Sequence, residues 1–183
     1  MIKKILLGLL AVIVVAIAAL CIVVSMQPND FRYSRSLTMN APASVVFEQV
    51  NNLKKSENWS PWAKLDPNMK VTYEGPGAGA GAKYSWAGNE MVGEGRVTIV
   101  ESKPNELVTT KLEFIKPFEA TNTAEYALKS EGNQTTVTWS MYGKANFVSK
   151  CMGLFMNCEK MIGDEFDKGL AAMKTIVEGK PQS

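Results

Sequence analysis

The sequence predicts an α+β fold in which a curved antiparallel sheet of about seven strands wraps around a long C-terminal helix. Between residues 70 and 142, short runs of β-forming residues recur with turn signals between them, which indicates a meander of strands. From Asn146 to Val177, apolar residues instead follow a period near 3.6, typical of an amphipathic helix. Such a helix must bury its apolar stripe, and the concave face of a curved sheet is the large partner available.

The N-terminal segment predicts a transmembrane helix. Lys3 and Lys4 precede residues 5–24, which form an apolar run without charge. Twenty helical residues span about 30 Å, the hydrocarbon thickness of a bilayer. We therefore expect residues 1–26 to be an N-terminal anchor that contacts the membrane through residues 5–24. The two lysines favour a cytoplasmic N-terminus, with the domain exported to the periplasmic or extracellular side.

A cleaved signal peptide is the alternative for this segment. Ala16-Ile17-Ala18 fits a small-x-small cleavage site after an apolar run of acceptable length. Cleavage there would leave Ala19 to Val24 as an apolar mature end, so we favour an uncleaved single-pass anchor.

The remaining elements follow in order after a polar linker at residues 27–30. Residues 31–178 form the predicted domain, and residues 179–183 form a tail. A first strand covers 31–39. A short helix then runs to about Asn52, with Asn40 or Ala41 at its cap and Pro42 in its first turn. Residues 53–68 are irregular or contain a second short helix. The further strands are expected at 70–74, 82–87, 93–101, 106–115, 119–128 and 135–142. The final helix at 146–177 has possible kinks near Gly153 or Gly163.

Composition excludes several function classes. Outside Lys3 and Lys4 the chain has 18 basic and 18 acidic residues, so this part has no net positive charge of the kind that nucleic-acid-binding proteins carry. It contains no histidine, which removes Ser-His-Asp and Cys-His catalysis and most zinc sites. We predict no catalytic residues, metal or cofactor, and the sequence does not predict an oligomeric state.

The cysteines do not predict a disulfide. Cys151 and Cys158 lie seven residues apart in a helical pattern, an axial rise of about 10.5 Å at 1.5 Å per residue. A disulfide requires Cα atoms within about 7 Å, so the two cannot pair inside one helix. They are either small apolar core residues or a reactive thiol pair, and the exported domain must be stable through its core alone.

These elements, in this order, resemble the START/birch-allergen/polyketide-cyclase superfamily, often abbreviated SRPBCC. Within it the chain resembles the bacterial polyketide cyclase/dehydrase and lipid-transport type with an N-terminal membrane anchor. The resemblance covers residues 31–178, and its motifs are Asn40-Ala41-Pro42, Val46-Phe47, Trp59-Ser60-Pro61-Trp62, Asp66-Pro67, Gly81 to Asn89, Gly93-Glu94-Gly95, Phe114 to Phe118, Thr136 to Trp139 and Gly169-Leu170. It implies a helix-grip fold with an internal pocket between the sheet and the long helix. It says less about activity, because the superfamily contains binders and enzymes alike.

Two other sequence patterns, a glycine-rich run and a pair of charged strand residues, do not predict a functional site. The glycine-rich run at residues 75–83 lacks the Gly-Lys-Ser/Thr of a phosphate loop, because Lys83 follows Ala82 and precedes Tyr84. Strand alternation puts Glu94 and Arg96 opposite the apolar set of the same strand, so we expect both to face solvent.

The candidate ligand-binding residues are mainly large apolar side chains of the strands and the long helix, joined by one amide. Each is either plain core or part of an apolar pocket with a few orienting polar groups. They are Trp59, Trp62, Tyr84, Trp86, Phe114, Phe118, Asn122, Tyr126, Trp139, Cys151, Leu154, Phe155 and Cys158. For Trp59 and Trp62 the two alternatives are a hydrophobic plug at one end of the barrel and a pocket mouth that contacts the ligand.

Three functions remain open at this point. The first is membrane-anchored binding or transport of a hydrophobic small molecule or lipid, without chemistry. The second is a cyclase, dehydratase or hydrolase acting on an apolar substrate, which would need an internal dyad such as Glu113 with Tyr126 or Arg96. The third is an envelope interaction module, which predicts a filled core and an exposed apolar patch.

Overall fold

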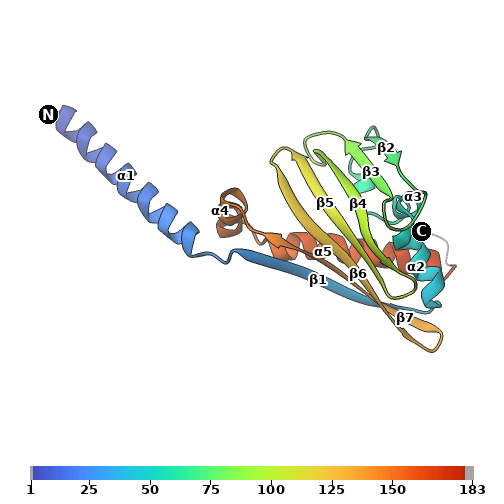
Figure 1. Cartoon of the computed structure of the whole chain (residues 1–183). Coiled ribbons are helices and arrows are strands. Elements are labelled where there is room, and N and C mark those ends of the chain that lie inside the picture. The colour runs from blue at the N-terminus through green and yellow to red at the C-terminus, as the bar shows by residue number, and fades with distance from the viewer. Residues whose placement is uncertain (1, 180–183) are drawn as a thin grey trace.

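The computed structural model describes residues 2–179, so residues 180–183 of the predicted tail lie outside the described part. Helix α1 (Ile2–Met26) projects away from the domain (Figure 1). Its segment Lys3–Met26 is long and apolar enough to cross a bilayer, a composition that fits a membrane span or a signal segment. Among the α1 residues whose exposure is described, only Val24 is buried.

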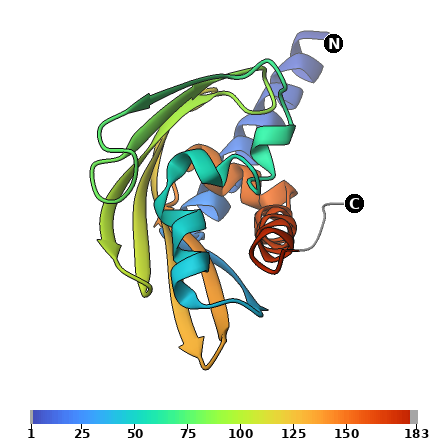
Figure 2. The same ribbon diagram turned by 90° about the vertical axis from the view of Figure 1, so that its right-hand side faces the viewer.

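The domain is built on one antiparallel sheet of seven strands in the order β1-β7-β6-β5-β4-β3-β2. The α+β fold predicted from the sequence is therefore confirmed, including the meander. The sheet curves around α5 (Cys158–Val177), which Figure 2 views nearly end-on. The strands are β1 (Asp30–Met39), β2 (Lys70–Glu74), β3 (Lys83–Ala87), β4 (Glu94–Lys103), β5 (Leu107–Lys116), β6 (Ala120–Glu131) and β7 (Gln134–Lys144).

Strand register divides the side chains between two faces of the sheet. Residues that pair directly across strands point to the same face. Leu37 pairs with Val137, and Val137 pairs with Leu128, so these apolar residues share the concave inner face. The intervening Ser36 and Thr138 point to the convex outer face, where their hydroxyl oxygens lie 2.8 Å apart. Alternation in the sequence thus produces an apolar inner and a polar outer face.

The first short helix starts later than the sequence suggests. Helix α2 (Ala43–Asn51) has Pro42 as its N-cap, with φ −61° and ψ 149°. Because this ψ is extended, Pro42 precedes the first turn instead of lying inside it. A second short helix, α3 (Leu53–Ser56), follows, with the Asn52 side chain accepting a hydrogen bond from Lys54 N at 3.0 Å. The 3₁₀ turn η1 (Trp62–Lys64) completes this connection.

The C-terminal helix is two helices, so the expectation of one helix at 146–177 is wrong. Helix α4 (Phe147–Phe155) ends at Met156, whose backbone is extended, and α5 then begins. The Asn157 side chain caps α5 by accepting a hydrogen bond from Lys160 N at 2.9 Å. Asparagine is a strong N-cap, which explains a helix start at this position. Helix α5 runs unbroken through Gly163.

Helix α5 fills the inner face beside β1 and β7. Phe166, Leu170 and Met173 are fully buried at helical spacing and belong to one core with Met39 and Trp139. Burying each such side chain stabilises the fold by about 1.5–3 kcal/mol relative to exposure.

Candidate functional site

An aromatic cluster lies in the part of the core where α5 packs on the sheet. The Trp139 ring stacks on Phe166 with centroids 4.1 Å apart. Trp59 meets Trp139 edge-on at 5.4 Å, and its indole N–H donates to the Gln49 carbonyl at 3.2 Å. Trp59 is only 2% exposed. Trp62 meets Trp139 at 5.6 Å but stays partly exposed, so it lies at the edge of this cluster.

Trp139 has one notable polar feature. Its indole nitrogen is buried and has no hydrogen-bond partner within the described residues. A buried donor without an acceptor costs about 1–3 kcal/mol, so such groups are uncommon in folded proteins. Tyr126, which pairs with Trp139 across β6 and β7, is partly exposed on the same inner face.

The inner face is less completely covered over β3, β4 and β5. Helix α5 packs against β1, and α2 packs against β5, β6 and β7. Several large apolar side chains on the inner face of β3–β5 are therefore only partly buried: Tyr84, Trp86, Val97, Leu112 and Phe114. Together with Tyr73 of β2 they form what we call the aromatic floor.

Trp86 is held against the sheet within the aromatic floor. A Cβ at Gly95 would collide with the Trp86 ring, so the glycine permits this close approach. The Trp86 N–H donates to the Val92 carbonyl at 3.0 Å, and its ring meets Phe114 edge-on at 5.9 Å. The ring is thus fixed by contacts below and beside it.

The tyrosines of this face remain neutral at physiological pH. Burial, followed by the nearby Glu57 carboxylate, raises the pKa of Tyr84 to about 12. Burial also raises the pKa of Tyr126. The Tyr73 hydroxyl donates to Glu57, and burial together with this bond raises its pKa. These hydroxyls are suited to hydrogen bonding rather than to proton abstraction.

The dyad considered for an enzyme is not formed on the inner face. Glu113 lies on the outer face, where Arg96 Nε and Nη2 donate to it at 2.8 and 3.1 Å and Lys111 lies 2.8 Å away. Hydrogen bonds from Arg96 and then Lys111 lower the pKa of Glu113 to about 2. Glu113 and Tyr126 therefore point to opposite faces. Glu94 and Arg96 face outward as expected, and Lys116 Nζ donates to Glu94 at 2.7 Å.

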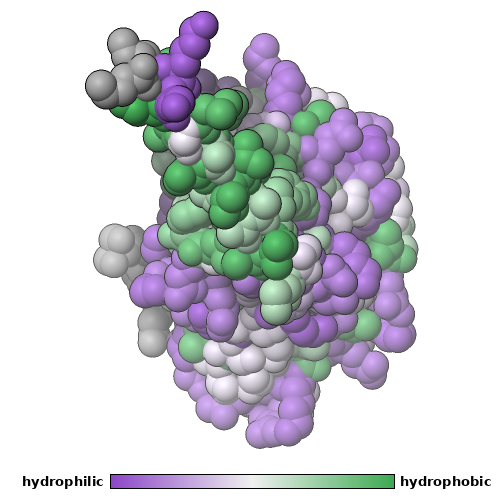
Figure 3. All heavy atoms as spheres, turned by 90° about the vertical axis from the view of Figure 1, so that its left-hand side faces the viewer, coloured by the Kyte–Doolittle hydropathy of each residue, from purple (hydrophilic) through white to green (hydrophobic). Residues whose placement is uncertain are grey.

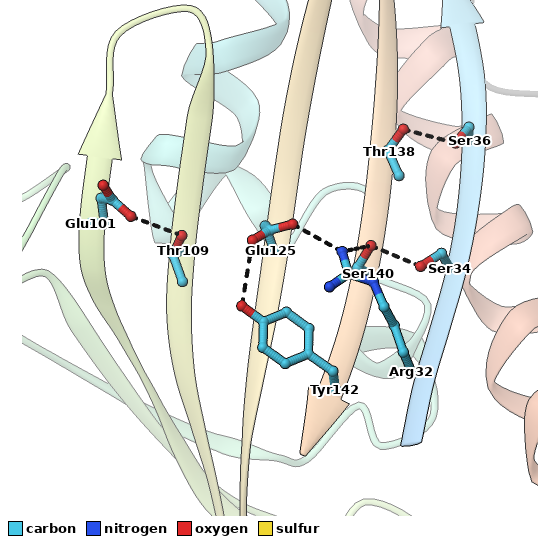
Figure 4. Close-up of polar contacts among 9 residues, drawn as sticks. All are labelled: Arg32, Ser34, Ser36, Glu101, Thr109, Glu125, Thr138, Ser140 and Tyr142. Carbon is cyan, nitrogen blue, oxygen red and sulfur yellow. Dashed lines mark hydrogen bonds and ion pairs between the residues drawn. The ribbon is translucent and has the colours of Figure 1, made fainter. Parts of the chain in front are cut away.

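A polar network extends across the outer face between β1, β7 and β6 (Figure 4). Arg32 donates to Glu125 and to the Ser140 hydroxyl, both at 3.0 Å. The Ser34 and Ser140 hydroxyl oxygens lie 2.8 Å apart, and Tyr142 donates to Glu125 at 3.4 Å. These contacts pair the polar side chains that β1, β6 and β7 place on the outer face.

Most of the remaining candidate residues lie apart from the aromatic floor, whereas Asn122 pairs with Leu112 of the floor across β5 and β6. Phe118 is exposed in the turn between β5 and β6, and Cys151 lies on α4. Asn122 lies on the inner face of β6 against Gly143, close to the start of the strand. Leu154, Phe155 and Cys158 flank the break between α4 and α5. Both Cys151 and Cys158 are free thiols on separate helices.

Two open hollows lie near the α1 end of the domain. One, of about 450 Å³, is lined by the α4–α5 junction, including Leu154, Phe155 and Cys158, together with Tyr33 of β1. The other, of about 750 Å³, includes Arg32, Lys111 and Tyr142 of the outer face. Within residues 2–179 no group of three or more Cys, Asp or Glu side chains forms a metal site.

The candidate residues of the sequence analysis do not include Tyr33, Tyr73, Val97 and Leu112, which also belong to these surfaces. Alternation along β4 and β5 is the signal that places Val97 and Leu112 inward, opposite Arg96 and Glu113. Tyr33 has no comparable signal, because its neighbours come from the unpredicted break between α4 and α5.

The seven-stranded sheet around a C-terminal helix defines a helix-grip-like domain. A family model described as polyketide cyclase/dehydrase and lipid transport matches residues 30–178. The chain therefore belongs to this family, within the SRPBCC superfamily. A comparison with curated proteins gives no match.

Solved structures share the fold. A protein from Chromobacterium violaceum is 14% identical, with a TM-score of 0.58 over 85% of this chain and 100% of that chain. The major latex-like protein 151 of Panax ginseng is 14% identical, with a TM-score of 0.58 over 82% of this chain and 99% of that chain. A protein from Mesorhizobium loti is 8% identical, with a TM-score of 0.60 over 83% of this chain and 100% of that chain. Such low identities show the fold alone.

Proposed function

We propose that the protein binds or transports a hydrophobic small molecule or lipid at a membrane, without chemistry. The observation that carries this proposal is the aromatic floor, a continuous set of large apolar side chains left partly exposed on the inner face of β3–β5. Leaving apolar surface in water costs about 25 cal/mol per Å², so an apolar ligand that covers the floor recovers this free energy.

A few polar groups border this apolar surface, as is usual for small-molecule sites. The Tyr126 hydroxyl and the Asn122 amide lie on the same inner face. The unpaired indole N–H of Trp139 is a buried donor next to Tyr126. A ligand with an ester, carboxyl or hydroxyl oxygen on an apolar body would match this combination.

The N-terminal helix supplies the membrane part of the proposal. With residues 5–24 in the bilayer, only Gln27, Pro28 and Asn29 separate α1 from β1. The domain then stands next to a source of lipid. The two lysines at the N-terminus favour its exported orientation.

Photo-crosslinking in vesicles tests the proposal. The full chain is reconstituted with lipid that carries a photoreactive group on its acyl chain, and the crosslinked residues are mapped by mass spectrometry. We expect crosslinks in β3, β4 and β5 at inner-face residues such as Trp86, Leu112 and Phe114, in addition to those in α1. Crosslinks confined to α1 and α4 would contradict lipid binding on the aromatic floor.

A further inference from the structure

Helix α4 carries a dense group of exposed apolar side chains. Outside α1, twelve large apolar side chains of the described residues are strongly exposed, and five of them lie between residues 147 and 156. We call these five the α4 face: Phe147, Val148, Met152, Phe155 and Met156. Phe155 is the most exposed at 79%. No residue of α4 is buried in the domain, so packing on the sheet does not explain this composition.

The α4 face occupies one side of the helix. At 100° per residue, its members fall within about half of the helix circumference, and Ser149 and Gly153 fall on the other half. Of the partly buried residues, Lys150 and Leu154 lie just outside this half, at its Phe147 edge, and Cys151 falls within it next to Phe147. The Phe147 edge therefore borders the domain, and the rest of the apolar side, from Phe155 to Met156, is directed away from it.

The end of α1 lies directly beside α4. The two helices are in contact, and Val24 near the end of α1 is fully buried. Asn29 ties the linker to the start of α4. Its carbonyl accepts a hydrogen bond from Ala145 N at 2.8 Å, and its side chain accepts one from Lys150 Nζ at 2.7 Å. Figure 1 shows α1 running away from the domain, with α4 beside the end of α1.

The surface charge near this helix is suited to a membrane. The sequence has no Asp or Glu between Glu131 and Glu159. Two lysines flank the start of α4: Lys150, and Lys144, which also pairs with Asp30 at 2.7 Å. Figure 3, which views the α1 side of the molecule, shows the apolar band of α1 bordered by hydrophilic surface. An amphipathic helix with this pattern binds the boundary between headgroups and acyl chains, with lysines toward the headgroups.

We propose that α4 lies in the surface of the bilayer that α1 crosses and inserts the α4 face into its apolar boundary. This inference rests on the proposed membrane anchor and adds a second membrane contact. The contact of α4 with α1, and the hydrogen bonds from the start of α4 to Asn29, hold α4 near the point where α1 leaves the bilayer. Two contacts fix the orientation of the domain, which a flexible tether alone would leave free. The hollow lined by Tyr33, Leu154 and Phe155 then opens toward lipid.

Depth-dependent fluorescence quenching on the full chain tests this arrangement. Cys21, Cys151 and Cys158 are replaced by serine, and single cysteines are introduced by Val148→Cys on α4 or Val45→Cys on α2. The two valines are matched, with exposures of 38% and 40%. A third protein retains only the native Cys21 of α1. Each is labelled with an environment-sensitive nitrobenzoxadiazole group and reconstituted into phosphatidylcholine/phosphatidylglycerol vesicles.

Two quenchers distinguish the outcomes: nitroxide-labelled lipid from within the bilayer and dithionite from the water. We expect the labels at Cys21 and at position 148 to lose fluorescence to lipid nitroxide, and the label at position 45 to lose it only to dithionite. A lipid-quenched Cys21 with a water-quenched position 148 would overturn the α4 proposal and leave the anchor standing. A water-quenched Cys21 would overturn the anchor itself, and with it the α4 proposal.

Protection of position 148 from both quenchers would mean that protein covers α4, which also contradicts membrane insertion. Because a label at one position can disturb a short helix, Met152→Cys on α4 and Leu65→Cys provide a second pair, exposed by 43% and 37%. Circular dichroism of each labelled protein checks that the fold is kept. The same contrast between the members of this pair is expected, and equal water quenching of both would overturn the proposal.

Discussion

The two halves of the inner face both carry large apolar side chains, but they differ in how completely helices pack on them. Beside β1 and β7, the face is filled by Phe166, Leu170 and Met173 of α5. Over β3–β5, the aromatic floor is just as apolar but remains partly exposed. The comparison teaches that strand alternation decides which residues point inward, whereas the path of a helix decides whether they become core or the lining of a site.

The largest contrast is expected between two phenylalanines. Phe166→Ala removes a ring that is 1% exposed and stacked on Trp139, so we expect a loss of about 3–5 kcal/mol of unfolding free energy. Phe114→Ala removes a partly exposed ring of the aromatic floor and should cost about 1 kcal/mol. Chemical denaturation measures both. Equal losses would mean that β3–β5 is ordinary core.

Two glycines give the next contrast. A Cβ at Gly169 would lie 2.8 Å from the Trp139 ring, so Gly169→Ala should cost about 1–3 kcal/mol through overpacking. A Cβ at Gly153 of α4 meets nothing within 4 Å, so Gly153→Ala should be neutral or stabilise by up to about 1 kcal/mol. Thermal unfolding of the two variants compares the covered core with α4. Similar destabilisation by both would contradict the exposed position of α4.

A buried hydroxyl in the covered half gives a smaller effect. Thr135 is fully buried, and its hydroxyl donates to the Ala41 carbonyl at 2.8 Å. Thr135→Val keeps the shape and removes this donor, so we expect a loss of about 1–2 kcal/mol. The exposed Thr121→Val on the outer face is the control, with little change expected. Urea titrations of both variants test the difference, and an unaffected Thr135→Val would show that this bond adds no net stability.

The smallest effect concerns the outer face and depends on pH. The pKa of Glu113 is lowered to about 2 from 4.5, so its ionised form stabilises the folded state above pH 4.5. That contribution is lost as the pH falls from about 4.5 toward about 2. The difference in unfolding free energy between the wild type and Glu113→Gln should therefore shrink over this range, while Glu119→Gln serves as an exposed control. A difference that stays constant with pH would contradict the ion pairs.

Much of the sheet is predictable from the sequence because alternation and turn signals are local. The strand from Glu94 to Lys103 illustrates this: Gly95 and Val97 point inward, and Glu94 and Arg96 outward, as the pattern indicates. The division of the C-terminal segment is not predictable in the same way. Apolar periodicity continues through residues 151–162, and only the N-cap at Asn157 marks the break.

The candidate site was harder to predict than the fold because it depends on the positions of helices relative to strands. Tyr84, Trp86 and Phe114 are brought together by the β3–β4–β5 register. Leu154 and Phe155 were predicted, as residues of one long helix, to be core or to line the same apolar pocket, but the break at Met156–Asn157 places them on α4. Their roles as ligand contacts remain predictions, as do those of the other candidate residues.

The central claim, that the aromatic floor holds an apolar ligand, is tested most directly by a matched pair of substitutions. Leu112→Gln places an amide on the inner face, and Thr98→Gln places one on the outer face of the neighbouring strand. Photo-crosslinking of acyl-chain lipid to β3–β5 is then measured as a function of lipid concentration for both variants. Loss of one buried apolar contact should weaken binding about tenfold in Leu112→Gln and leave Thr98→Gln like the wild type. Equal crosslinking in the two variants would contradict the claim.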